Sequence, residues 1–127
     1  GDAVAPSPNG ASTGMEVIEF EHIIATGTTS ATAVAIPAYS VVCGVTGRVT
    51  QALGGTLGSF RLGVGSSLSR YGSGLKLGVG NLIIGQTGTP ITYYADTPLV
   101  LTATGGAFNG GRVRLAIHVT SLTVPRA

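Results

Sequence analysis

The sequence predicts an all-β protein: an antiparallel β-sandwich of jelly-roll-like form. Apolar and polar residues alternate along most of the chain, which is the period of a half-buried strand. Glycine occurs 21 times and keeps these alternating runs short. No stretch has the three- and four-residue spacing of an amphipathic helix. Seven or more short strands with glycine-rich turns are typical of sandwiches and barrels.

The first fourteen residues differ from the rest. The stretch "GDAVAPSPNGASTG" is rich in Gly, Pro, Ser and Ala and has no period, so residues 1–14 are predicted to form an extended arm or linker. Alternation begins at Met15. Residues 15–127 are therefore predicted to form a single β-sandwich domain, a size that one core can support.

The first and last predicted strands, 16–24 and 111–122, carry opposite charges on one face. The charged residues are Glu19, Glu21, Arg112 and Arg114. We predict that these strands are neighbours, because opposite charges across a strand pair are stabilising. Their other faces should then pack side by side through Ile18, Phe20, Val113 and Leu115. Binding of an external anion is the alternative explanation for the basic part of the chain.

The stretch 39–53 predicts one long strand. Its inward residues are predicted to be Val41, Cys43, Val45 and Val49. Gly47 falls on the same face, where a bend or a close contact is expected. Cys43 is the only cysteine, so an internal disulfide and a cysteine-based zinc site are excluded. We expect Cys43 to be a small buried hydrophobic residue.

Two similar stretches, "RLGVG" at 61–65 and "KLGVG" at 76–80, resemble phosphate-binding loops. Neither precedes a predicted helix, and neither has the spacing of a known phosphate loop. We therefore predict two strands joined by a polar loop at 66–74. Their glycine-bearing faces should be approached by another backbone or a ligand. Further strands are predicted at 28–37 and 98–104.

The composition indicates association with other protein chains. Charged residues make up 9% of the sequence, against about 25% in an average domain. We expect a homo-oligomer, with a trimer first and a pentamer next. No apolar run is long enough to span a membrane, so membrane insertion is not expected. The basic residues are scattered singly, which argues against a nucleic-acid site.

Catalytic and metal-binding patterns are lacking in the sequence. GxSxG, HExxH and CxxC do not occur, and no spacing supports a catalytic set built on Asp96 and His118. His22 lies on the apolar face of the first strand, where a hydrogen-bonded core or interface histidine is expected. We predict a protein that is not an enzyme and binds neither a cofactor nor a metal.

A set of short motifs spanning residues 32–119 resembles a known family. Their order and spacing are similar to the C-terminal domain of head-spike or fibre-like proteins from alphaproteobacterial tailed phages and gene transfer agents. The matching residues are Ile36-Pro37, Arg48-Val49-Thr50, Ser59-Phe60, Arg70-Tyr71-Gly72, Pro90, Tyr93-Tyr94, Thr97-Pro98, Leu101-Thr102-Ala103, Gly105-Gly106, Phe108, Gly110-Gly111 and His118.

This resemblance implies a structural protein on the surface of a phage or phage-like particle, at its head. Its expected partners are capsid or other virion proteins and a host polysaccharide. The favoured role is a head spike or fibre domain that engages host glycan; the alternatives are a decoration protein that clamps capsid subunits and a free lectin. Because loops and exposed aromatics suit recognition, the predicted glycan-binding residues are Arg70, Tyr71, Tyr93 and Tyr94.

Overall fold

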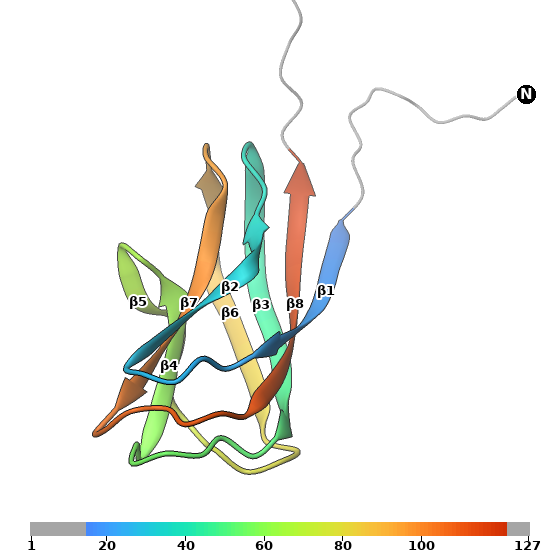
Figure 1. Ribbon diagram of the computed structural model, residues 1–127. Helices are drawn as coiled ribbons and strands as arrows, with labels where there is room; N and C mark the ends of the chain where they lie inside the picture. The colour runs from blue at the N-terminus through green and yellow to red at the C-terminus, as the bar shows by residue number, and fades with distance from the viewer. Residues whose placement is uncertain (1–14, 122–127) are drawn as a thin grey trace, which may run out of the picture.

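The computed structural model describes residues 15–121, so the predicted arm at 1–14 lies outside the described residues. Eight β-strands, joined by turns and loops, make up this part of the chain (Figure 1). They are β1 (Glu16–Ile23), β2 (Thr29–Ile36), β3 (Ser40–Gln51), β4 (Ser59–Val64), β5 (Ser67–Leu75), β6 (Leu82–Tyr93), β7 (Thr97–Thr104) and β8 (Arg112–Ser121).

The strands are arranged as one long hairpin that is rolled into two layers. β4 pairs with β5, β3 with β6, β2 with β7 and β1 with β8, all antiparallel. Ladders between β3 and β8 and between β4 and β7 join these pairs into sheets of order β1-β8-β3-β6 and β2-β7-β4-β5. Two four-stranded antiparallel sheets with this nested connectivity form a jelly roll. The predicted fold class is confirmed.

The core lies between the two sheets and follows the predicted alternation. The inward residues of β4 and β8 are each at most 1% exposed. They are Phe60, Leu62, Val64, Val113, Leu115, Ile117 and Val119. Burying a side chain of this size contributes about 1.5–3 kcal/mol. These two strands therefore supply a large share of the stability of the sandwich.

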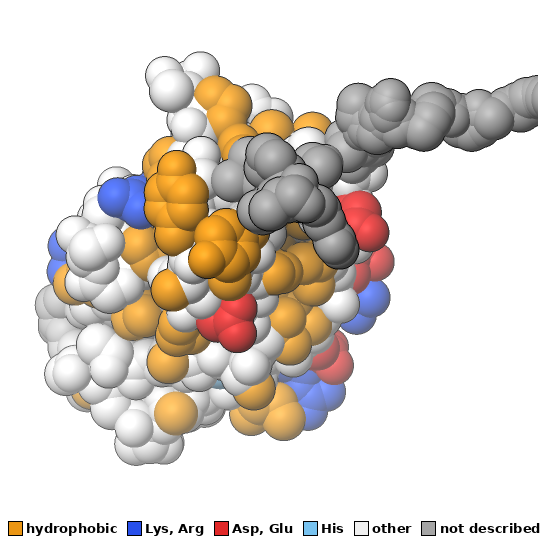
Figure 2. Space-filling view, turned by 90° about the horizontal axis from the view of Figure 1, so that it is seen from above, with side chains coloured by type: hydrophobic (Ala, Val, Ile, Leu, Met, Phe, Trp, Pro, Cys, Tyr) orange, Lys and Arg blue, Asp and Glu red, His pale blue; other side chains and the backbone are white. Residues whose placement is uncertain are grey.

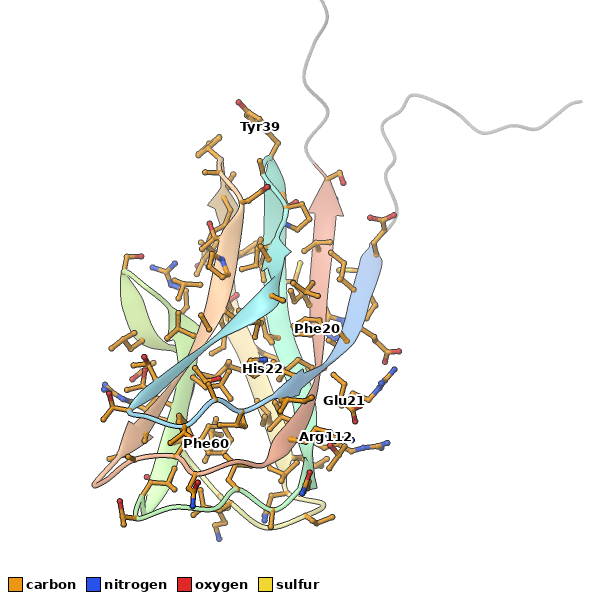
Figure 3. The ribbon with its side chains drawn as sticks, viewed as in Figure 1. Phe20, Glu21, His22, Tyr39, Phe60 and Arg112 are labelled. Atoms are coloured by element: carbon orange, nitrogen blue, oxygen red, sulfur yellow. The ribbon has the colours of Figure 1, made fainter. Side chains whose placement is uncertain are left out.

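β1 and β8 are neighbours, as their charges predict. Phe20 lies opposite Leu115 in the ladder, and Glu21 lies opposite Arg114. A carboxylate oxygen of Glu19 is 3.5 Å from the guanidinium of Arg114. The corresponding distance between Glu21 and Arg112 is 3.9 Å, and Figure 3 shows both side chains projecting from the same side of the sheet. The opposite charges of these two strands are thus matched within the fold.

The pairing of Glu19 with Arg114 predicts a measurable coupling. Glu19→Arg should lower the free energy of unfolding by about 0.2–1 kcal/mol, a small effect because both side chains are largely exposed. Adding Arg114→Glu should recover part of the loss in denaturant titrations. A double variant no more stable than the sum of the two single changes would show that the pair does not interact.

At the start of β3, the residues that face the core are not those predicted from the sequence. Val42 is completely buried, whereas Val41 and Cys43 are only half-buried. A β-bulge between Val42 and Gly44 adds one residue to the strand and shifts the alternation. The inward placement of Val45 was correctly predicted, but those of Val41 and Cys43 were wrong because single-sequence alternation cannot locate a bulge.

The strand after β4 also differs from the prediction. β5 occupies 67–75, the segment predicted as a loop, and "KLGVG" at 76–80 is itself the loop that follows. Val64 pairs with Ser67, so β4 and β5 are joined by a two-residue turn at Gly65 and Ser66. A Gly-Ser pair between strands is a recognised hairpin signal.

Glycines on the strands permit close backbone contacts. A Cβ atom built at Gly47 would overlap the carbonyl oxygen of Arg114 and lie 2.9 Å from Cδ2 of Leu115. At Gly63 it would overlap the carbonyl oxygen of Ser67. The close contact predicted at Gly47 and the backbone approach predicted for the 61–65 stretch are confirmed.

Candidate functional site

One end of the sandwich, here called the glycine end, is closed by backbone hydrogen bonds. It consists of the loops 24–28, 52–58, 76–81 and 105–111. Phe108 N–H donates to the carbonyl of Gly27 at 2.7 Å, and Gly27 N–H donates to the carbonyl of Phe108 at 3.1 Å. The Phe108 ring is 1% exposed and packs edge-to-face on Phe60. This tightly paired end is a structural closure.

The opposite end, here called the tyrosine end, carries an exposed aromatic pair. It consists of the turns 37–39 and 94–96. Tyr39 and Tyr94 are 51% and 69% exposed, and their rings meet edge-to-face with centroids 6.2 Å apart. Figure 2 looks down on this end and shows hydrophobic side chains gathered over it; Figure 3 shows Tyr39 at its tip. Large exposed apolar side chains in one place are typical of a contact surface.

Tyr39 has an unusual backbone. Its φ of +60° is the left-handed conformation, which costs a bulky residue about 1–2 kcal/mol relative to the right-handed one. The adjacent Ala38 N–H donates to Oδ1 of Asp96 at 2.8 Å, which ties the two turns together. An exposed tyrosine held in a strained turn indicates a function outside the core. Tyr39 is not among the residues predicted from the sequence to bind glycan, although its place in a tight turn after Pro37 is a usable signal.

Three of the four predicted glycan-binding residues form one network, but it is mostly internal. The hydroxyl oxygens of Tyr71 and Tyr93 are 2.7 Å apart, and Nη1 of Arg70 donates to the Tyr93 hydroxyl at 3.1 Å. The Arg70 guanidinium also lies 6.0 Å from the centre of the Tyr93 ring. Tyr71 and Tyr93 are 1% and 7% exposed. Their rings therefore pack in the core, while Arg70 on β5 is half-buried.

The hydroxyl of Tyr71 is held in its neutral form. Burial raises its pKa well above the usual value, and the hydrogen bond with Tyr93 raises it further. The network thus links β5 in one sheet to β6 in the other. Of the predicted residues, only Tyr94 presents an exposed aromatic ring; glycan binding by the four residues remains a prediction.

His22 is the buried core histidine that the sequence predicts. Its side chain is 9% exposed, and Nε2 lies 2.7 Å from Oγ of Ser30, which also accepts from the Ala25 N–H at 3.0 Å. Figure 3 shows His22 directed between the sheets. Burial lowers the pKa of His22, because it disfavours the charged imidazolium.

The lowered pKa of His22 predicts a loss of stability in mild acid. Below the unfolded-state pKa of about 6.5, the unfolded chain binds a proton more readily than the folded chain does. The free energy of unfolding should therefore decrease as the pH is lowered from 8 to 5. His22→Gln should flatten this dependence in denaturant titrations from pH 8 to 5. His118→Gln serves as the control for the second histidine. Retention of the full slope in His22→Gln would contradict the assignment.

The outer face of the β1-β8-β3-β6 sheet holds an open hollow of about 400 Å³. Its lining comes from all four strands: Glu19, Thr46, Gly47, Arg48, Leu82, Ile83, Ile84, Arg114, Leu115 and Ala116. Leu82 and Ile84 are each 66% exposed. The hollow therefore combines guanidinium groups with aliphatic side chains.

Two of the groups considered for catalysis and metal binding, Asp96 and His118, can be located in the described residues. Within 15–121, no group of three or more His, Cys, Asp or Glu side chains is placed to hold a metal ion. Asp96 and His118 have separate partners, since His118 Nε2 lies 2.9 Å from Oγ1 of Thr46. The same part of the chain contains no helix long and apolar enough to cross a membrane.

Comparisons with known proteins give a likeness of fold. No family model and no curated protein matches the sequence. Among solved structures, the chain is similar to one described as "Cyanophage Pam1 capsid asymmetric unit", with a TM-score of 0.67. The two share 21% sequence identity over 94% of this chain and 93% of that chain. The likeness is one of fold, while the resemblance to head-spike proteins stays a prediction.

Proposed function

We propose that this chain is a non-enzymatic structural protein of a phage or phage-like particle, bound to the capsid surface as a decoration protein. The observation that carries the proposal is the near-complete overlap of its jelly roll with a chain from a phage capsid asymmetric unit. Shared fold alone does not define function, so the proposal also depends on the surface of this chain.

Two surface features support attachment through protein contacts. The sequence is poor in charge, and aliphatic side chains of β1 and β6 remain exposed on the outer sheet face; these are Val17, Ile23, Leu82 and Ile84. The buried core of a protein interface is more apolar than the rest of the surface, and arginine is enriched in interfaces. The glycan role becomes the second candidate because Tyr71 and Tyr93 are core residues.

Sedimentation of intact particles tests this function. Particles from a host encoding an epitope-tagged chain should carry the tag through a density gradient, together with the major capsid protein and in a constant ratio to it. As a control, purified tagged chain is mixed with particles from a host lacking the gene. Co-sedimentation in this mixture shows that the chain binds to the outside of assembled particles. A tag found only in the soluble fraction would overturn the proposal.

A spike or fibre domain that engages host glycan is the second candidate, and the exposed Tyr39–Tyr94 pair favours it. Aromatic faces offer flat apolar area with a polar hydroxyl at the edge, which suits sugar rings. Both rings lie in turns on a rigid sandwich, the usual location of recognition residues.

Substitutions of the aromatic pair test glycan binding. Tyr94→Ala and Tyr39→Gly should each weaken binding to host polysaccharide by about tenfold, equivalent to about 1.4 kcal/mol. Tyr39→Gly should leave thermal stability nearly unchanged, because glycine adopts the left-handed turn without strain. Tyr94→Phe, which keeps the ring, is the matched control in cell-adsorption and glycan-array assays. Unchanged binding by both folded variants would remove the pair from any glycan site.

A further inference from the structure

Among residues 15–121, the hollow on the outer sheet face has a positive charge without a carboxylate partner. Arg48 and Arg114 lie directly opposite each other in the β3–β8 ladder. Arg114 has Glu19 at 3.5 Å, but within residues 15–121 no carboxylate lies within 4.0 Å of Arg48. Like charges opposite each other on neighbouring strands are destabilising. A carboxylate brought to Arg48 from outside would relieve this repulsion.

The apolar part of the hollow indicates that a protein, not a sugar, supplies the carboxylate. Leu82 lies opposite Arg48 and Ile84 lies opposite Thr46, so two exposed aliphatic side chains flank the arginine on β6. None of the described residues that line the hollow is aromatic. Sugar rings stack on aromatic faces, whereas the buried core of a protein interface is apolar and enriched in arginine.

The chain itself carries a matching surface on β1. The outward row of this edge strand reads Val17, Glu19, Glu21 and Ile23. Val17 is 50% exposed and Ile23 is 68% exposed, and the Glu19 side chain retains 58% exposure beside Arg114. This row presents two carboxylates between two aliphatic side chains. The hollow presents the opposite charge, on Arg48, beside the aliphatic side chains of Leu82 and Ile84, so the two surfaces are complementary.

We infer that copies of this chain associate through this sheet, with the β1 row of one copy seated against Arg48, Leu82 and Ile84 of the next. β1 and β6 are the two edges of the sheet, three strand spacings or about 14 Å apart. Because both surfaces lie on the same sheet face, two copies that face each other across a two-fold axis form the contact twice, β1 against β6 and β6 against β1. This inference does not depend on attachment to a particle.

Charge and apolar substitutions test this contact on the purified full chain. Analytical ultracentrifugation at micromolar concentration should show an oligomer for the wild type. Arg48→Glu and Ile84→Asp should each shift the dissociation constant upward by at least tenfold. Lys76→Glu and Val79→Asp are the matched controls, because Val79 is 65% exposed and both residues lie in the loop 76–81 at the glycine end.

A charge reversal distinguishes this contact from a nonspecific effect. The variant combining Arg48→Glu with Glu19→Lys and Glu21→Lys restores opposite charges across the contact, so it should associate more tightly than Arg48→Glu alone. Circular dichroism melting establishes that each variant is folded. A monomeric wild type, an oligomer insensitive to both Arg48→Glu and Ile84→Asp, or no recovery in the combined variant would overturn the inference. Particle binding by a monomeric chain would leave the proposed function standing while removing this contact.

Discussion

Replacing Phe108 with alanine is expected to lower the free energy of unfolding by about 3–5 kcal/mol. The ring is 1% exposed and packs on Phe60, so its removal leaves a cavity where the glycine-end loops meet the core. The backbone bonds of Phe108 with Gly27 hold the surrounding loops in place and limit collapse around the cavity. Urea denaturation measures the loss.

Phe20→Ala is the control for Phe108→Ala. Phe20 lies on β1 and is only partly buried, so its removal should cost clearly less. A loss below about 1 kcal/mol for Phe108→Ala, or one no greater than that for Phe20→Ala, would contradict the closure of the glycine end by the Phe108 ring.

The second large effect is expected at Gly85, where the two sheets approach each other closely. A Cβ atom at this position would overlap the carbonyl oxygen of Tyr71 and lie 2.7 Å from the carbonyl oxygen of Val45. Both neighbours are backbone atoms of other strands, so neither can move as a flexible side chain would. Gly85→Ala should therefore destabilise the protein by about 3 kcal/mol, the upper range for overpacking.

Gly88→Ala is the matched control on the same strand. Nothing lies within 4 Å of a Cβ atom built at Gly88. Alanine there reduces the entropy of the unfolded chain and should be neutral or stabilising by up to about 1 kcal/mol. Equal stabilities for Gly85→Ala and Gly88→Ala would show that the close approach at Gly85 is absent in solution.

The strands that could be predicted are those whose burial follows a simple alternation. In β8 every second residue from Val113 to Val119 faces the core, and the alternation of apolar and polar residues in the sequence predicts this placement. The neighbouring placement of β1 and β8 was also accessible, because Glu19 and Arg114 needed partners of opposite charge. Local pattern and long-range pairing agree in these strands.

The errors arose where backbone geometry interrupts the alternation. The bulge between Val42 and Gly44 reverses the faces of Val41 and Cys43, and Gly44, an isolated glycine inside a strand pattern, was not interpreted as its signal. β5 was missed because its alternation is weak, although the Gly65-Ser66 pair gave the position of the turn. For β5, the Gly-Ser turn signal was a better indicator of the strand's position than the pattern of hydrophobic residues.

The candidate surfaces depend on contacts that no local pattern contains. Tyr71 and Tyr93 are both aromatic residues near turns, yet their burial follows from the packing of β5 against β6 across the two sheets. The exposure of Tyr94 could be predicted from its turn, but its pairing with Tyr39 could not. The hollow at Arg48 needs four strands that are not consecutive in sequence.

Cryo-microscopy of the parent particle tests the proposed role most directly. A particle from a host that encodes this chain should show the eight-stranded sandwich as separate density on the outer shell, in contact with capsid subunits. Particles lacking the gene should show the same shell without that density. A shell unchanged by loss of the gene, with no density into which the jelly roll fits, would contradict a structural role in the capsid.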